Sequence, residues 1–136
     1  MRLCDRITII GLGLIGGSLG MAIRRKRLAR EVVGWSRRAS TRTQAKRLGA
    51  IDRGAASLAE AVREADVVVL ATPVDVIVPL ARRAARSMRP GSILTDVGST
   101  KGSIVRALGS RLPNQVTFVG AHPLAGSEQR GVTAAS

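Results

Sequence analysis

Residues 7–18 read ITIIGLGLIGGS, and this stretch decides the fold. Its β-branched beginning predicts a buried strand over 7–10, and apolar residues at helical spacing follow from residue 16. Between the two lies the pattern G-x-G-x-x-G, formed by Gly11, Gly13 and Gly16. The pattern alone is weak evidence, but between a strand and a helix it is typical of a phosphate-binding turn.

Each glycine of this turn has a physical task. Gly11 permits the tight turn, Gly13 lets the backbone approach a pyrophosphate, and Gly16 lets the helix pack closely on the strand. Free N–H groups at the start of the helix, around Leu14 and Ile15, and the positive end of its dipole would then hold the anion. The alternative is a glycine-rich turn without a ligand. The backbone entropy that three glycines cost counts against it.

Outward from this unit, short β-branched runs alternate with helical patterns. We predict further strands at 31–35, 66–71, 92–97 and 115–120, and helices at 16–28, 41–48, 58–64, 74–88 and 101–112. Right-handed crossovers between such elements give an α/β fold with a doubly wound, mostly parallel, Rossmann-like sheet. We interpret residues 1–136 as one dinucleotide-binding domain that is incomplete at its C-terminal end.

Composition bounds the class of protein. The chain has 136 residues, 45% of them hydrophobic, and apolar runs too short to span a bilayer. Its single cysteine, Cys4, excludes a disulfide framework and a cysteine-based zinc site, so we predict no metal and a cytoplasmic location. A net charge of +13 could suggest nucleic acid. The basic residues are scattered, however, and only Trp35 and Phe118 are aromatic, so small anionic ligands are the better expectation.

The identity of the dinucleotide is indicated by the end of the second strand. NAD-binding versions of this fold carry an acidic residue there, which hydrogen-bonds the adenosine ribose. This sequence has Ser36 in that place, followed by Arg37 and Arg38, and arginine pairs with a 2′-phosphate. We therefore predict NADP rather than NAD, the alternative being that both arginines are merely solvated. Thr72 and Pro73 end the third predicted strand and should border the cofactor's ribose.

A second set of polar residues follows the last two predicted strands. His122, the only histidine, comes directly after the strand at 115–120, with Ser127 and Glu128 in the same Gly/Pro-rich loop. Ser99 follows the preceding strand. Ligands of open α/β sheets bind outside the carboxyl ends of the strands, so Ser99 and His122 could meet in one crevice. Histidine is the side chain best suited to accept a proton near neutral pH.

Four motifs together resemble the prephenate/arogenate dehydrogenases of tyrosine biosynthesis, namely GLGLIGGS at 11–18, ATP at 71–73, TDVGSTK at 95–101 and GAHPLAGSE at 120–128. The resemblance implies an NADP-dependent oxidative decarboxylation of prephenate or arogenate. Hydride would leave the hydroxyl-bearing ring carbon for nicotinamide while His122 accepts the hydroxyl proton, and loss of CO2 would make the ring aromatic. The resemblance also implies that Ser99 orients the hydroxyl and His122. Glu128 would help gate the pocket, with Ser127 in the same loop.

The sequence departs from the family in one respect. The resemblance implies that family members continue into a helical domain that forms a homodimer and supplies substrate contacts, whereas we expect this 136-residue chain to be an N-terminal part without it. We therefore expect an incomplete substrate pocket. Two alternatives remain open: a catalytically silent NADP-binding fragment, and another Rossmann dehydrogenase such as a β-hydroxyacid dehydrogenase or imine reductase. Those enzymes would be expected to carry a catalytic lysine or aspartate on a later helix, and the His122 loop argues against them.

Overall fold

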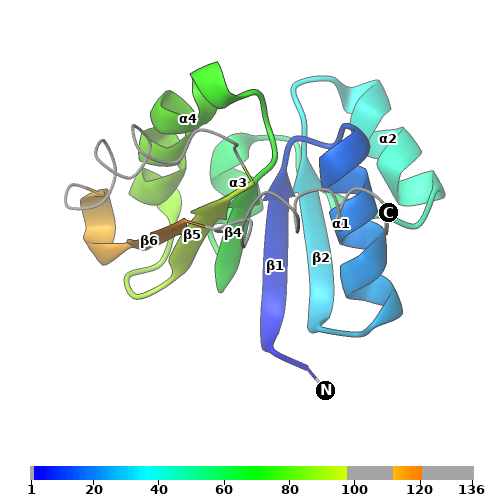
Figure 1. The fold of residues 1–136 in the computed structure, drawn as a ribbon, viewed down its shortest axis with the longest axis horizontal. Coiled ribbons are helices and arrows are strands. Elements are labelled where there is room, and N and C mark those ends of the chain that lie inside the picture. Colours follow the sequence, from blue (N-terminus) through cyan, green and yellow to red (C-terminus); the bar gives the residue numbers. More distant parts are fainter. Residues whose placement is uncertain (1, 98–111, 121–136) are drawn as a thin grey trace, which may run out of the picture.

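The computed structural model describes residues 2–97 and 112–120. Within them, six parallel strands form one sheet in the order β3-β2-β1-β4-β5-β6 (Figure 1). The strands are β1 (Cys4–Ile10), β2 (Ala29–Trp35), β3 (Arg53–Gly54), β4 (Val67–Leu70), β5 (Ile93–Asp96) and β6 (Thr117–Gly120). The helices are α1 (Leu14–Arg25), α2 (Ala39–Arg47), α3 (Leu58–Val62) and α4 (Val74–Ser87), with a 3-10 turn η1 (Pro113–Gln115). The predicted doubly wound fold is confirmed.

The boundaries differ from the predicted ones where charged residues join the sheet. β1 and β2 begin earlier than predicted because Cys4 pairs with Ala29, and an ion pair between Arg6 and Glu31 (2.8 Å) bridges the two strands. The edge strand β3 was not predicted, since two residues are too few to show any periodicity. The helix predicted at 101–112 lies outside the described residues except for its last position.

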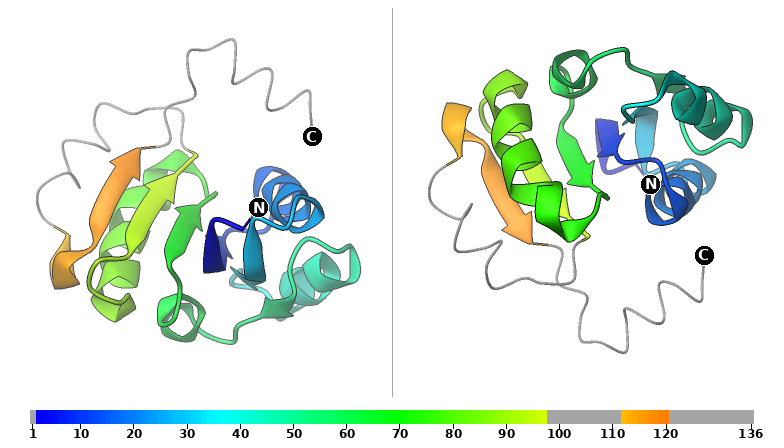
Figure 2. Two further views of the ribbon diagram at one scale, coloured as in Figure 1. Left: turned by 90° about the horizontal axis from the view of Figure 1, so that it is seen from below. Right: turned by 90° about the horizontal axis from the view of Figure 1, so that it is seen from above.

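Two apolar layers flank the sheet, because successive strand residues point to opposite faces. Ile9 and Val69 lie in the layer beneath α1 and α2, whereas Ile10 and Leu70 lie in the layer beneath α3 and α4. Figure 2 shows α4 and α1 on opposite sides of the sheet. Thr8, fully buried on the α3 side, donates a hydrogen bond to the Ala61 carbonyl at 2.6 Å and is thereby satisfied.

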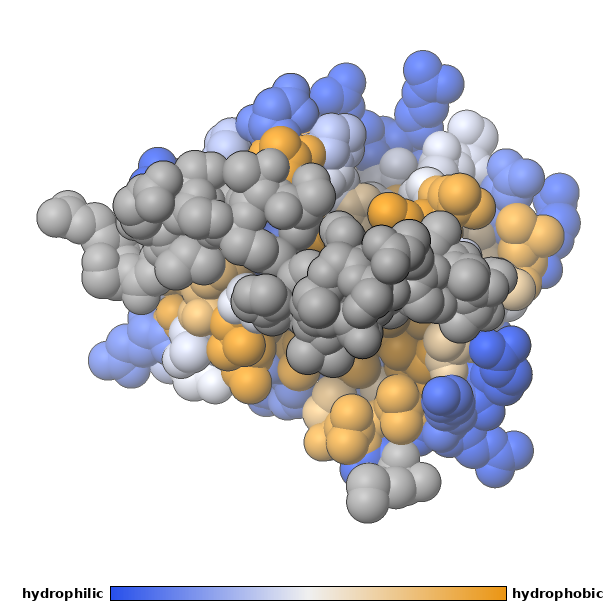
Figure 3. Space-filling view, in the orientation of Figure 1, coloured by the Kyte–Doolittle hydropathy of each residue, from blue (hydrophilic) through white to orange (hydrophobic). Residues whose placement is uncertain are grey.

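The longest helix in the described part of the chain is α4, with 14 residues. No helix among these residues is both long enough and apolar enough to cross a membrane. Figure 3 shows hydrophilic side chains along the upper rim of the molecule. This is the end at which the strands run into the helices that follow them.

Candidate functional site

The turn after β1 lies at the point where the strand order of the sheet reverses. β1 is hydrogen-bonded to both β2 and β4, and the chain leaves β1 and β4 for helices on opposite faces. The N–H of Gly11 donates to the Trp35 carbonyl at 2.9 Å, and the N–H of Ala71 donates to the Ile10 carbonyl at 2.8 Å. The glycine turn is therefore held between the ends of β2 and β4. In open α/β sheets, ligands bind at such a switch point.

Gly11 and Gly16 close this turn by close backbone contact. Gly11 has a φ of +99°, a conformation that glycine adopts without strain. A Cβ atom on Gly16 would lie 1.9 Å from the Gly11 carbonyl oxygen, and one on Gly11 would lie 2.6 Å from the Ala71 carbonyl oxygen. Only glycine fits at either position. The close contact of Gly16 is with the turn itself rather than with the body of the strand.

Gly13 differs, because no atom in the described part of the chain requires a glycine there. It caps the N-terminus of α1 at a φ of −78°, which any residue can adopt, and a Cβ atom there would meet no described residue within 4 Å. No side chain caps this helix end, and its first turn carries no acidic residue. The N–H groups ahead of the first helical hydrogen bond, from Gly17 to Gly13, have no acceptor within the helix. Such a cradle fits an anion that approaches the backbone closely.

Unsatisfied and apolar groups border the same turn. The hydroxyl of Thr72 is buried without a hydrogen-bond partner, although buried polar groups are normally satisfied. The Thr72 methyl would lie 2.8 Å from a Cβ on Gly11, so this residue is packed against the turn. Leu14 is 85% exposed and Ile15 is 55% exposed on the first turn of α1. Pro73 is exposed and is the N-cap residue of α4. A ligand here would find a hydroxyl and an apolar rim.

The connection from β2 to α2 carries the predicted basic residues. Arg37 and Arg38 are exposed, and Arg38 caps α2 without a side-chain hydrogen bond and without an acidic residue in the first turn. The Ser36 carbonyl accepts a hydrogen bond from Arg42 Nη1 at 2.6 Å. Arg42 was not singled out from the sequence. Its spacing of four from Arg38, which places both on one side of a helix, was the available signal.

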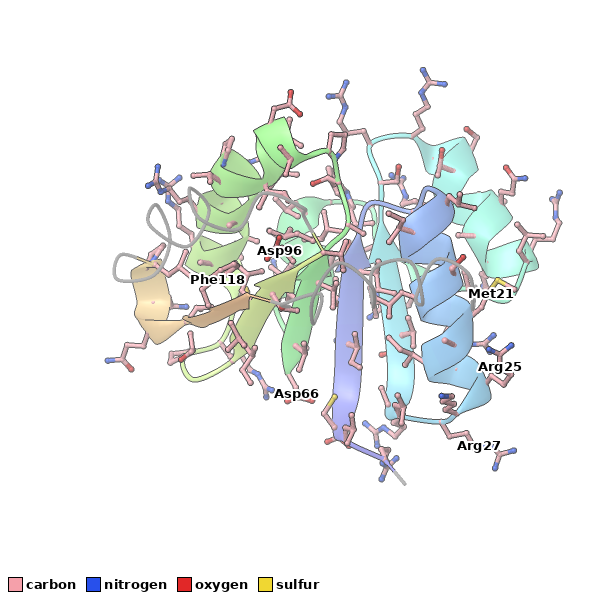
Figure 4. All side chains as sticks on the ribbon, viewed as in Figure 1. Met21, Arg25, Arg27, Asp66, Asp96 and Phe118 are labelled. Carbon is pink, nitrogen blue, oxygen red and sulfur yellow. The ribbon has the colours of Figure 1, made fainter. Side chains whose placement is uncertain are left out.

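The residues predicted to act on the substrate lie outside the described residues, namely Ser99, His122, Ser127 and Glu128. The strands that lead to them are described, and in the register of the sheet Asp96 is paired with Gly120. The chain therefore leaves β5 and β6 at neighbouring positions of the same edge. Asp96, the last residue of β5, is fully buried (Figure 4).

At the opposite edge of the sheet, the charge of Asp66 is paired. Asp66 Oδ2 accepts the N–H groups of Asp5 and Arg6, each at 3.0 Å, and Arg89 donates to Oδ1. Burial raises the pKa of Asp66, but the hydrogen bonds from these three donors together lower the pKa by more than burial raises it. The pKa of Asp66 therefore lies below its ordinary value. Burial and the charges of Asp66 and Asp5 raise the pKa of the Cys4 thiol, which makes a reactive thiolate unfavourable there. Figure 4 shows Asp66 at this lower end.

Comparison with known proteins agrees with the fold. A family model described as "Prephenate dehydrogenase, nucleotide-binding domain" matches residues 19–136. The prephenate dehydrogenase of Bacillus subtilis (strain 168) is 40% identical over 132 residues, which is 96% of this chain and 36% of that protein. The chain thus spans little more than a third of that curated relative.

Two solved structures extend the comparison. The prephenate dehydrogenase of Aquifex aeolicus, solved with hydroxyphenyl propionate and NAD+, superposes with a TM-score of 0.78 at 30% identity, over 90% of this chain and 42% of that one. The arogenate dehydrogenase of Synechocystis superposes with a TM-score of 0.73 at 31% identity, over 89% of this chain and 41% of that one. Both similarities cover about nine-tenths of this chain and less than half of the longer chain.

Proposed function

Because this chain belongs to the prephenate dehydrogenase family, within its nucleotide-binding domain, we propose that it binds a nicotinamide dinucleotide across the carboxyl edge of its sheet. The observation that carries this proposal is the cradle at Gly13. No side chain caps the start of α1, and a Cβ atom on Gly13 would meet no atom of residues 2–97 and 112–120 within 4 Å. The pyrophosphate is held there by the N–H groups of Leu14 and Ile15 and by the helix dipole.

The dinucleotide of this proposal is NADP. Its adenosine ribose lies beside Ser36, where no carboxylate repels a 2′-phosphate. Arg37 and Arg38 are exposed and free to turn toward that phosphate, and the uncapped start of α2 adds further N–H donors. Thr72 and Pro73 would border the ribose near the nicotinamide, and this ribose would supply the hydrogen-bond partner that the buried Thr72 hydroxyl lacks.

The reaction of this proposal is the oxidative decarboxylation of prephenate or arogenate in tyrosine biosynthesis. When bound, nicotinamide supplies the hydride acceptor. His122 accepts the proton of the substrate hydroxyl as hydride leaves the same ring carbon, a step for which imidazole is suited near neutral pH. Ser99 orients that hydroxyl and the imidazole, while Ser127 and Glu128 border the pocket. The ring then loses CO2 and becomes aromatic, which draws the reaction forward.

Cofactor binding by this chain tests the proposal directly. Trp35 is the only tryptophan and there is no tyrosine, so quenching of its emission reports binding of the reduced cofactors. We expect tighter binding of NADPH than of NADH, and an Arg37→Ala/Arg38→Ala variant that weakens NADPH about tenfold or more with little change for NADH. An Arg83→Ala/Arg86→Ala variant, which removes two exposed charges from α4, is the control. Equal weakening of both cofactors would contradict the NADP assignment.

The chemical role of His122 is tested separately. His122→Asn should abolish NADP reduction with prephenate or arogenate and leave cofactor binding unchanged, since it removes the proton acceptor alone. The assay uses this chain and, in parallel, the longer B. subtilis relative with the equivalent substitution. Loss of cofactor binding in the variant would show that His122 has a structural role instead.

A further inference from the structure

We propose that Arg42 is a positioning residue for cofactor specificity, which holds the loop of Ser36, Arg37 and Arg38 in the conformation that presents its arginines to a 2′-phosphate. This inference rests on the proposed function, because it concerns the same end of the dinucleotide. It assigns to Arg42 no contact with the cofactor. Arg42 acts on the loop backbone, and the loop arginines act on the phosphate.

The contacts of Arg42 close this loop at its first residue. Its Nη1 donates to the Ser36 carbonyl at 2.6 Å, six residues back along the chain. The loop is closed at its other end by α2, because the Arg38 carbonyl accepts the N–H groups of Thr41 (3.1 Å) and Arg42 (3.3 Å). Three residues are therefore held between a guanidinium and a helix. Arg37, between these two closures, keeps an exposed side chain.

Packing fixes the stem of Arg42 as well as its head. A Cβ atom on Gly54, in the edge strand β3, would lie 3.0 Å from the Arg42 Cβ and close to the rest of its aliphatic stem. Gly54 therefore lets the stem lie against the edge of the sheet. Arg42 is half-buried, unlike Arg37, Arg38 and Arg47. A side chain held at both stem and head loses little further entropy when it orders the loop for a ligand.

A positioning role predicts a dependence that a direct contact does not. If Arg42 acts only through the loop arginines, its substitution lowers the preference for a 2′-phosphate when Arg37 and Arg38 are present. In a variant that lacks Arg37 and Arg38, the same substitution has no effect on this preference. If Arg42 instead touches the phosphate, its effect adds to theirs. A double-mutant cycle separates the two cases, because coupled residues are non-additive.

The experiment measures dissociation constants of adenosine 2′,5′-bisphosphate and of AMP, which differ only in the 2′-phosphate. The dissociation constant of AMP divided by that of the bisphosphate measures the preference for a 2′-phosphate. We expect Arg42→Met, which keeps the apolar stem, to lower this ratio about tenfold, since a charge-assisted hydrogen bond is lost. Arg42→Lys keeps a hydrogen-bond donor and should keep much of the wild-type ratio. Arg47→Met, at the exposed end of α2, is the matched control and should leave the ratio unchanged.

Adding Arg42→Met to Arg37→Ala/Arg38→Ala should lower the ratio no further. The melting temperature of each unliganded variant shows that the fold persists. If the wild-type ratio is well above one and Arg42→Met leaves it unchanged, the role of Arg42 is wrong while the NADP assignment stands. The same conclusion follows if Arg42→Met lowers the ratio in the triple variant as much as it does in the wild type. A wild-type ratio near one would overturn the NADP assignment, and with it this inference.

Discussion

The two edges of the sheet treat polar groups in opposite ways. At the edge where the strands begin, Asp66 accepts three hydrogen bonds and Glu31 pairs with both Arg6 and Arg53. At the edge where the strands end, α1 and α2 begin without side-chain caps and the Thr72 hydroxyl is buried without a partner. The paired edge stabilises the fold, whereas the unpaired edge leaves donors for a ligand to satisfy.

The difference follows from the topology. In a parallel sheet the helix that follows each strand begins at the carboxyl edge, so its free N–H groups gather there. The other edge receives helix C-termini and strand beginnings, where carboxylates and arginines can pair. Substitutions that change one edge and not the other test this difference.

The largest expected effect comes from Gly16→Ala. The added Cβ would lie 1.9 Å from a backbone oxygen of the turn, which no rotamer change relieves. We expect the free energy of unfolding to fall by about 3 kcal/mol or more, with loss of cofactor binding. Thermal unfolding followed by circular dichroism measures the first, and Trp35 emission the second.

The neighbouring Gly17 provides the matched control. A Cβ there would meet nothing within 4 Å, and the position lies inside α1. Gly17→Ala should therefore raise the free energy of unfolding by about 0.5–1 kcal/mol, through lower backbone entropy of the unfolded chain. Equal melting temperatures for the two alanine variants would contradict the proposed closure of the turn.

The second prediction concerns the paired edge. Asp66→Asn removes the charge that two backbone N–H groups and Arg89 stabilise. We expect about 2 kcal/mol less stability and unchanged cofactor affinity, measured by urea unfolding and by Trp35 quenching. Glu64→Gln, an exposed acid nearby, should change neither quantity. If Asp66→Asn weakened cofactor binding, the two edges would not be independent.

The pH dependence of stability has a defined sign at the same residue. Because the pKa of Asp66 is lowered in the folded chain, its contribution is fully present above the ordinary carboxyl pKa and is lost as the pH falls through the folded value. The difference in unfolding free energy between wild type and Asp66→Asn should therefore shrink on acidification below about pH 4. A constant difference down to low pH would remove Asp66 from the explanation.

Sequence patterns predicted what depends on periodicity and on fixed spacing. The strand-turn-helix unit around Gly11 and the alternation of strands and helices were visible because apolar period and glycine spacing are local properties. The buried Thr72 hydroxyl and the two-residue β3 were not, since each depends on packing between segments distant in the sequence. The Arg42 contact spans only six residues and was missed, although its spacing of four from Arg38 was a signal. The predicted roles of Ser99 and His122 concern residues outside the described part and stay predictions.

A fourth prediction concerns Gly13→Ser, which should raise stability and weaken cofactor binding. The serine side chain enters open space and caps α1, so the unliganded chain should gain a few tenths of a kcal/mol. The same hydroxyl takes the N–H groups that the pyrophosphate needs, and we expect cofactor affinity to fall about tenfold. Calorimetric titration with NADP+ measures the affinity. Unchanged affinity would show that no ligand occupies this cradle.

The smallest expected effect compares two threonines, one at each kind of site. Thr72→Val removes a buried hydroxyl that has no partner, so the unliganded chain should keep its stability or gain slightly, while cofactor affinity falls about threefold. Thr8→Val removes a buried hydroxyl that is bonded to Ala61 at 2.6 Å, and should cost about 1 kcal/mol of stability without affecting the cofactor. Both substitutions exchange a hydroxyl for a methyl group, so their contrast isolates whether the partner of the hydroxyl belongs to the chain or to the ligand. If Thr72→Val destabilised the unliganded chain as Thr8→Val does, its hydroxyl would be a structural group, and the unpaired edge would lose one of its functional donors.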